Sequence, residues 1–291
     1  MDFNALKNKS SMGKLSKALE SLSGGANKKN GDDRFWTPDV DKTGNGYAVI
    51  RFLDSPQVDG ENGMPWVQVF NHGFQGPGGW YIENCLTTMS GAKCPVCEKN
   101  NELWNSGVES NKDIARTRKR KLTYISNVLV VKDPTRPENE GKVFLFKFGK
   151  KIFDKIKEKI EPQFEDEKAI NPFNFWEGAN FKLKIRQVEG YRNYDKSEFD
   201  NVSAISGDDS VIEKIWKGSH SLKDFLKPSE FKSYDELKTK RDRVLGVGNS
   251  TGYSKSAESI EIEEEVNSDP TSVNSDDDDD ALGYFSKLAA E

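Results

Sequence analysis

One histidine and the only three cysteines of the chain lie close together in the sequence, as His72, Cys85, Cys94 and Cys97. Their spacing is His-x12-Cys-x8-Cys-x2-Cys, and the Cys-x2-Cys turn can supply two thiolates from one tight loop. Zinc prefers four tetrahedral nitrogen or sulfur ligands, so this set predicts one closed, structural zinc site per chain. The residues alone leave two alternatives, which are three unrelated buried thiols or a Cys-His nucleophilic pair. His220 has no cysteine near it, and we expect it on the surface.

Basic and aromatic side chains alternate through the middle of the chain. The run Arg116–Lys121 carries five positive charges in six residues, and a strand over 181–188 would place its three cations on one face. Single-stranded nucleic acids are held by cations along the phosphates and by rings that stack on the bases. For each ring, burial in the hydrophobic core is the alternative. We predict nucleic-acid contacts from Trp80, Tyr81, Arg118, Lys119, Arg120, Lys121, Tyr124, Phe146, Lys147, Lys182, Lys184, Arg186, Tyr191, Arg192 and Tyr194.

Short β-type runs, separated by Gly, Pro and Asp clusters, must position these residues. Five such runs span 47–53, 66–70, 124–131, 143–148 and 181–188. Their irregular spacing favours a small barrel over a doubly wound sheet, whose strands would alternate regularly with helices. Two helices are also expected, over 152–160 and 234–245. Ser233 with Glu236 forms a capping-box pattern before the second helix, and Gly246 is a typical stop after it.

Composition divides the chain into three parts. Residues 1–30 form a basic arm in which apolar residues recur at helical spacing before a Gly- and Asn-rich linker. Residues 31–248 look globular, and the metal subdomain would be inserted at about 65–120. Residues 249–291 are too polar to bury a core, so we expect them to be disordered. The expected fold class is mainly β with helices, α+β.

The net charge of −5 conceals an asymmetry. Residues 254–291 carry 12 acidic and two basic residues, which leaves 36 acidic and 41 basic residues in the rest of the chain. A basic body suggests a polyanionic partner, whereas the acidic tail either keeps the protein soluble or competes for the same surface. No stretch approaches the roughly 18 to 20 apolar residues of a membrane span, and the first residues lack a signal-peptide core. We therefore expect a cytoplasmic location.

Several stretches of the sequence are specific enough to indicate a family, namely 44–53, 71–74, 80–85, 94–97, 127–134, 138–144, 148–151, 176–181 and 193–195. With these stretches the chain resembles, along nearly its whole length, the single-stranded DNA-binding proteins of T4-type bacteriophages. The resemblance implies an oligonucleotide-binding (OB) fold, a five-stranded barrel, with an inserted zinc subdomain. It also implies a flexible arm that makes binding cooperative and an acidic tail that contacts a helicase loader, a polymerase and a recombination mediator.

The resemblance also assigns functions to single residues. The zinc ligands of the family fall on the histidine and three cysteines named above, and its DNA-contacting rings fall on Tyr124, Phe146, Tyr191 and Tyr194. A basic, hydroxyl-containing motif for self-association falls on Lys7, Lys9, Ser10 and Ser11, where Asn8 replaces a basic residue. Its second copy falls on 119–123, where Leu122 replaces a hydroxyl residue. The implied function is a cooperative coat on single-stranded DNA during replication, recombination and repair in the infected bacterium.

Two other classes of function need separate consideration. A zinc-containing regulator of translation that binds single-stranded RNA could use the same groove, because stacking and phosphate contacts do not distinguish the sugar. An enzyme is not expected. The sequence has no Gly-x4-Gly-Lys-Ser/Thr loop and no His-Glu-x2-His motif, and its acidic clusters lie mainly in the tail rather than in predicted strands.

Overall fold

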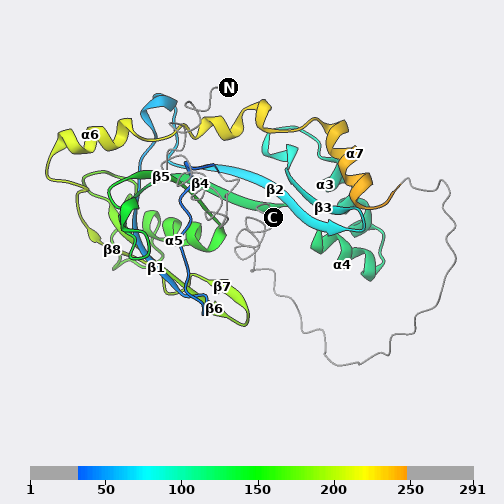
Figure 1. Cartoon of the computed structure of the whole chain (residues 1–291), viewed down its shortest axis with the longest axis horizontal. Coiled ribbons are helices and arrows are strands. Elements are labelled where there is room, and N and C mark those ends of the chain that lie inside the picture. Colours follow the sequence, from blue (N-terminus) through cyan, green and yellow to red (C-terminus); the bar gives the residue numbers. More distant parts are fainter. Residues whose placement is uncertain (1–31, 248–291) are drawn as a thin grey trace, which may run out of the picture.

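The structure is a computed structural model that describes residues 32–247 (Figure 1). The predicted arm, the predicted tail and the self-association residues Lys7, Lys9, Ser10 and Ser11 lie outside the described residues. Within 32–247, no helix is both long and apolar enough to cross a membrane.

The described strands form one eight-stranded antiparallel sheet, with helices around it (Figure 1). The order is β3-β2-β4-β1-β6-β7, and β5 pairs with β4 while β8 pairs with β6. The α+β class is thus confirmed. The hydrogen-bonded path does not close among these strands, so the five-stranded barrel is not confirmed. The strands are β1 (Gly46–Phe52), β2 (Val67–Gly76), β3 (Gly79–Asn84), β4 (Lys121–Lys132), β5 (Val143–Phe148), β6 (Ala179–Val188), β7 (Tyr191–Asn193) and β8 (Glu198–Val202).

Five helices and five short 3-10 turns surround the sheet in the described range. The two predicted helices are present as α5 and α7. The capping box of α7 is complete, because the Ser233 side chain accepts from the Glu236 backbone N–H and the Glu236 side chain accepts from Ser233. The helices are α3 (Pro95–Asn105), α4 (Glu109–Thr117), α5 (Lys150–Ile160), α6 (Asp209–Lys217) and α7 (Tyr234–Val244). The turns are η1 (Gln57–Asp59), η2 (Leu86–Thr88), η3 (Pro137–Asn139), η4 (Lys223–Leu226) and η5 (Pro228–Glu230).

The largest apolar core lies between β1, β4, β5, β6 and α5. β1 sends Ala48, Ile50 and Phe52 into this core, which alternation along a strand requires. Ile152 and Ile156 on α5 close it from one side. On the other face of β1, Arg51 is fully buried and donates to the backbone oxygens of the 171–178 and 203–205 loops. From Ala48 to Phe52, β1 is therefore covered on both faces.

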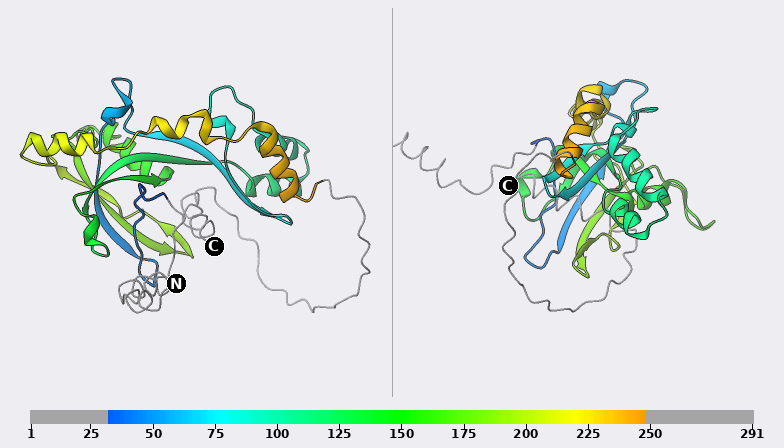
Figure 2. Two further views of the ribbon diagram at one scale, coloured as in Figure 1. Left: turned by 45° about the horizontal axis from the view of Figure 1, so that its top comes forward. Right: turned by 90° about the vertical axis from the view of Figure 1, so that its right-hand side faces the viewer.

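A second apolar core belongs to the β2–β3 hairpin, which extends away from the main body (Figure 2). α7 completes this core, because Leu237 and Val244 are buried in it and the Val244 carbonyl accepts from the Gly78 N–H at 2.8 Å. A side chain at Gly78 would collide with the backbone of α7. The metal subdomain predicted at about 65–120 is thus packed against a helix more than 100 residues further along the chain.

Candidate metal centre and nucleic-acid interface

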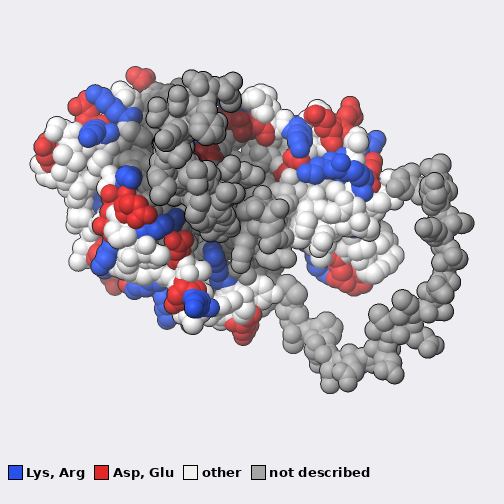
Figure 3. Space-filling model, in the orientation of Figure 1, with Lys and Arg blue, Asp and Glu red and all other residues white. Residues whose placement is uncertain are grey.

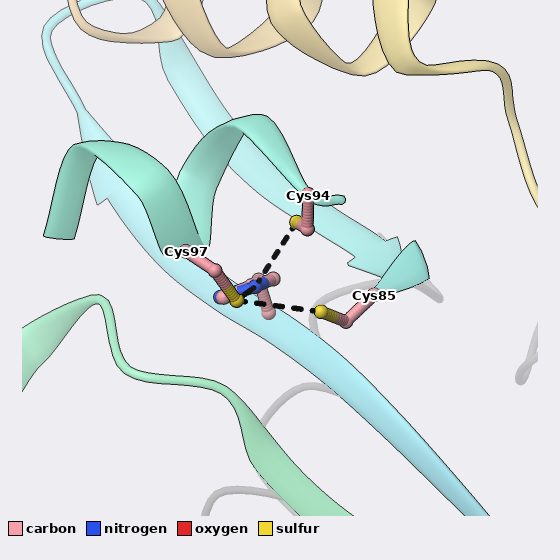
Figure 4. A group of neighbouring side chains, drawn as sticks. Cys85, Cys94 and Cys97 are labelled. Carbon is pink, nitrogen blue, oxygen red and sulfur yellow. Dashed lines mark hydrogen bonds between the residues drawn. The ribbon is translucent and has the colours of Figure 1, made fainter. Parts of the chain in front are cut away.

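The four predicted metal ligands converge on one point. His72 lies on β2, Cys85 directly follows β3, and Cys94 and Cys97 stand at the start of α3, with the three cysteine side chains turned toward one another (Figure 4). His72 Nε2 is 3.4 Å from Cys97 Sγ and 3.6 Å from Cys94 Sγ, and Cys85 Sγ is 3.6 Å from Cys97 Sγ. All four ligand atoms lie within 4.8 Å of one another. This excludes the alternative of three unrelated thiols.

These separations fit a tetrahedral zinc ion. With zinc bonds of about 2.3 Å to sulfur and about 2.0 to 2.1 Å to nitrogen, neighbouring ligand atoms stand about 3.6 to 3.8 Å apart. The chain supplies four nitrogen and sulfur ligands, and His72, Cys85 and Cys94 are buried while Cys97 is partly exposed. A closed set of four protein ligands is typical of a structural site, because catalytic zinc keeps one position for water or substrate.

A backbone contact orients the histidine. His72 Nδ1 lies 3.0 Å from the carbonyl oxygen of Arg118, so this nitrogen carries the proton and donates it. Nε2 is therefore the nitrogen directed at the cysteines, where a metal ion would take the place of its proton. The same hydrogen bond ties the basic segment before β4 to the metal centre. The segment 116–121 is therefore held in place by one of the four candidate metal ligands.

The pKa values of the cluster indicate which protons a metal ion would replace. Burial lowers the pKa of His72, but hydrogen bonds with the thiol groups of Cys85 and Cys94 raise it more, to about 9. Hydrogen bonds from Cys85 and Cys97 lower the pKa of the Cys94 thiol. Hydrogen bonds with Cys85 and Cys94 raise the pKa of the Cys97 thiol. Without a metal, a protonated His72 therefore faces the Cys94 thiolate, and a bound metal ion would replace the protons on Nε2 and on the remaining thiols.

Cations lie on aromatic rings along one face of β2, beside the metal centre. The guanidinium groups of Arg118 and Arg120 stand 5.7 and 4.2 Å from the ring centroids of Phe74 and Phe70. Phe70 and Phe74 flank His72 at a period of two, so all three point to one side of β2. Within residues 32–247, neither arginine has a carboxylate partner. Sequence reasoning missed both phenylalanines, although this period of two around His72 was a usable signal.

Four of the six predicted rings are buried. Tyr124 stacks on Phe153 with centroids 4.0 Å apart, and Tyr124, Phe146 and Tyr194 all belong to the main core. Tyr81 differs most from the expectation. Its side chain is 0% exposed and stacks on Phe74 in the core of the metal subdomain, so its ring has no free face for a base in this conformation. Trp80, its neighbour, is partly exposed.

Tyr191 is the most exposed of the predicted rings, at 50%. It stands beside the partly exposed Arg192 on β7, directly after a two-residue turn. The turn residues Glu189 and Gly190 both have positive φ, at 53° and 86°. This conformation matches the twist of a tight hairpin and explains the glycine. The turn thus places a ring and a cation at the tip of the β6–β7 hairpin.

The predicted cations differ in their surroundings. Lys182, Lys184 and Arg186 project from one face of β6 as expected, but each is paired with a carboxylate. Lys147 lies 4.2 Å from the ring centroid of Phe35. Lys119 and Arg120 are exposed, and Lys121 is half-buried at the first position of β4.

His220 is half-buried rather than on the open surface. Its backbone N–H donates to Asn127 Oδ1 at 2.9 Å, and its carbonyl accepts from Asn127 Nδ2 at 2.8 Å. Burial lowers the pKa of its imidazole. His220 therefore has a structural role, because its backbone connects β4 to the segment after α6.

Comparison with known proteins places these features in a family. The family model described as "gp32 DNA binding protein like" matches residues 44–245. The chain belongs to this family. It is 43% identical to the single-stranded DNA-binding protein of Enterobacteria phage T2 over 228 residues, which are 76% of this chain and 73% of that protein. It is 40% identical to the single-stranded DNA-binding protein of Enterobacteria phage T4 over 253 residues, 85% of this chain and 82% of that protein.

The family match covers the sheet and the candidate metal site. Residues 44–245 begin just before β1 and end one residue after α7. The match therefore contains the four metal ligands, the arginines over the β2 rings and all eight strands. The resemblance to T4-type phage proteins that the sequence motifs indicated is confirmed.

Proposed function

We propose that this chain is a non-catalytic protein that binds single-stranded DNA without sequence specificity. The observation that carries the proposal is the pair of arginines lying over Phe74 and Phe70 beside the metal centre. Each guanidinium group can contact a phosphate, and its flat face can stack on a base, which is what an unpaired strand needs. The names of the relatives from phages T2 and T4 point the same way.

The OB fold is part of this proposal. β1, β4, β5, β6 and β8 surround one apolar core, and the sheet curves around it (Figure 2). Strongly curved, partly open sheets of five strands are typical of OB folds, whose ligands lie across one face. The hairpin β2–β3 with α3, α4 and α7 would then be the inserted zinc subdomain.

Zinc is the metal that we propose for the four-residue site. It would join β2, the loop after β3 and the start of α3, and it would neutralise the thiolates. The residues around it then act on the nucleic-acid interface. His72 holds the carbonyl of Arg118, so loss of the site would release the segment that carries both interface arginines.

The finer parts of the proposal concern the residues outside 32–247. The basic arm with Lys7, Lys9, Ser10 and Ser11 would link neighbouring copies along the strand and make binding cooperative. The acidic tail would contact a helicase loader, a polymerase and a recombination mediator during replication, recombination and repair. Its last segment places Leu282, Tyr284, Phe285 and Leu288 after five aspartates, which suits an apolar anchor with acidic steering. The site of action would be the cytoplasm of the infected bacterium.

Titration of a fluorescent single-stranded oligonucleotide tests the interface. R118Q/R120Q should weaken binding and reduce the dependence of log K on log salt by about 1.4, since each phosphate contact on a single strand contributes about 0.7. The matched control is K99Q/K217Q, which removes two cations from exposed ion pairs on α3 and α6. Equal losses in both variants would refute the assigned interface. Tighter binding of the matched RNA would favour the RNA-binding regulator instead.

A further inference from the structure

The three cations on the outer face of β6 form a regular ladder of ion pairs. Lys182 Nζ is 2.9 Å from Asp200, Lys184 Nζ is 2.6 Å from Glu198, and Arg186 makes two hydrogen bonds with Asp195. Positive and negative side chains accordingly lie next to one another over the part of the molecule where Figure 1 places β1, β6 and β8 (Figure 3). The face that the sequence predicts to be cationic is therefore neutralised residue by residue.

This arrangement differs from that of the cations next to the metal centre. Arg118 and Arg120 face rings, and no carboxylate of residues 32–247 pairs with them. On β6, by contrast, every second residue from 182 to 186 has its own acidic partner. The protein thus contains one set of cations that is open to a polyanion and another that is already occupied.

The carboxylates come from two adjacent pieces of chain. Glu198 and Asp200 lie on β8, a five-residue edge strand whose pairing with β6 includes an irregularity, and Asp195 lies in the loop before it. The pairs are exposed to solvent, with 37% to 58% of each carboxylate side chain accessible. Exposed ion pairs are weak, so a phosphate can replace a carboxylate at modest cost. Hydrogen bonds from the paired cations also lower the pKa of all three carboxyl groups, which stay ionised at neutral pH.

Exposed rings flank the ladder. The register of the sheet places Tyr47 of β1 opposite Lys184, and its side chain is 42% exposed. Tyr191 lies beyond the Arg186 end of the ladder: it pairs with Val188, which is two residues after Arg186 on the same face of β6. The strip therefore combines three cations with two accessible rings, the same residue types that the interface beside the metal centre uses.

We propose that Asp195, Glu198 and Asp200 are built-in substitutes for nucleic-acid phosphates. They occupy the cations of β6 in the free protein and close a second strip of surface for single-stranded nucleic acid, which a strand uses only where its phosphates displace them. The inference rests on the proposed function and adds a regulated extension to its interface. The carboxylates thereby limit both the affinity and the salt dependence of binding.

The variant E198Q/D200N tests this directly, because it keeps the shape of both side chains while freeing Lys182 and Lys184. We expect affinity for an unstructured oligonucleotide to rise at least several-fold at low salt, and the salt slope to steepen by up to about 1.4, the value for two new phosphate contacts. E102Q/E213Q is the matched control, since it removes two negative charges from exposed pairs on α3 and α6. It should change affinity much less and leave the slope unchanged.

A second set of variants separates a new contact from a general charge effect. K182Q/K184Q should alter binding by less than about two-fold in the wild-type background but should cancel the gain in the E198Q/D200N background. An unchanged slope in E198Q/D200N, or a gain that survives K182Q/K184Q, would overturn the inference. If the double variant is unstable, the single variants E198Q and D200N replace it in the titrations, after thermal melting has compared the stability of each with that of wild type. If R118Q/R120Q also binds like wild type, the proposed function fails as well.

Discussion

The hydrogen bond between His72 Nδ1 and the Arg118 carbonyl decides, at the scale of the residue, which ring nitrogen faces the three thiols. With Nδ1 protonated, Nε2 is available for a metal at the point where the sulfur atoms meet. Because an unfolded chain has no such site, metal binding becomes part of the free energy of folding. One zinc ion per chain should therefore be essential for a stable metal subdomain.

Removal of a ligand tests this expectation. C94S should lose the metal and lower the melting temperature by about 10 °C or more, since several kcal/mol are lost and each changes the midpoint by about 2 to 4 °C in a protein of this size. Elemental analysis and thermal melting, with and without a chelator, measure both effects. Retention of one metal ion per chain, or an unchanged melting curve, would contradict the assignment.

Tyr81 provides a contrasting prediction inside the same core. Its hydroxyl group is buried and has no hydrogen-bond partner among residues 32–247, and burial raises its pKa, so the group stays protonated. A buried polar group without a partner destabilises the fold, whereas a phenylalanine keeps the stacking on Phe74. Y81F should therefore raise stability by about 1 kcal/mol without changing the metal content. Loss of metal in Y81F would show that the hydroxyl group supports a ligand.

Residue types were predictable from the sequence, but the exposure of individual rings was not. The metal ligands could be identified because few residue types bind zinc and the only three cysteines lie within 13 positions of one another. Tyr81, Tyr124 and Tyr191 were all predicted to contact nucleic acid, yet the first two are buried and the third is half exposed. Their difference depends on Phe74 and Phe153, which reach them only through tertiary packing.

α7 supports the metal subdomain from outside its own segment. It buries Leu237 and Val244 against the hairpin, and Lys240 pairs with Glu83 of β3. Its first turn is fixed by the capping box of Ser233 and Glu236. A less stable first turn of α7 should therefore lower the stability of the metal subdomain as well as that of α7 itself.

The variant S233A removes the cap. Stability should fall by about 1 kcal/mol, and hydrogen exchange should become faster in α7 and in the hairpin that it covers. T239A is the matched control, because Thr239 is exposed in the middle of α7 and its hydroxyl only donates to the Asp235 carbonyl. Alanine favours a helix interior, so T239A should be neutral or slightly stabilising. A loss in T239A as large as in S233A would show that the cap has no special effect.

Elements with a clear hydrophobic periodicity were predicted from the sequence, whereas elements that are stabilised mainly by tertiary contacts were not. β5 has the predicted bounds, and α5 and α7 agree with their patterns to within two residues at each end. β8 was missed because Glu198 and Asp200 make it look like a loop, and only their pairing with β6 explains their place in a strand. α3 was missed because its sequence is largely polar and it packs through few apolar residues near Cys94.

At the scale of the whole molecule, two bodies share strands β2 and β4, which run from the main core to the metal subdomain (Figure 2). The arginines over Phe70 and Phe74 lie where these strands enter the subdomain. A strand of nucleic acid bound there would contact both bodies. α7 ends against the turn of the same hairpin. Charged residues that follow α7 in the chain are therefore attached close to this interface.

The acidic segment 249–291 follows α7 in the chain and is attached in this way. Residues 249–291 carry 12 acidic and two basic residues, whereas the rest of the chain carries 36 acidic and 41 basic residues. A tethered segment has a high effective concentration at a cationic surface, so it should compete there with DNA. Truncation after Gly248 should therefore strengthen binding of single strands and destabilisation of duplexes at low salt, most simply measured by oligonucleotide titration and duplex melting.

The advantage of the truncated chain should shrink as salt rises, because the screening length falls from about 10 Å at 0.1 M to about 3 Å at 1 M. Replacement of Asp276–Asp280 by asparagine is the matched control, since it keeps the length of the tail and removes five of its negative charges. It should reproduce part of the effect of truncation if charge is the cause. If neither variant changes binding or duplex melting at low salt, the tail does not screen the interface, and its acidity serves solubility instead.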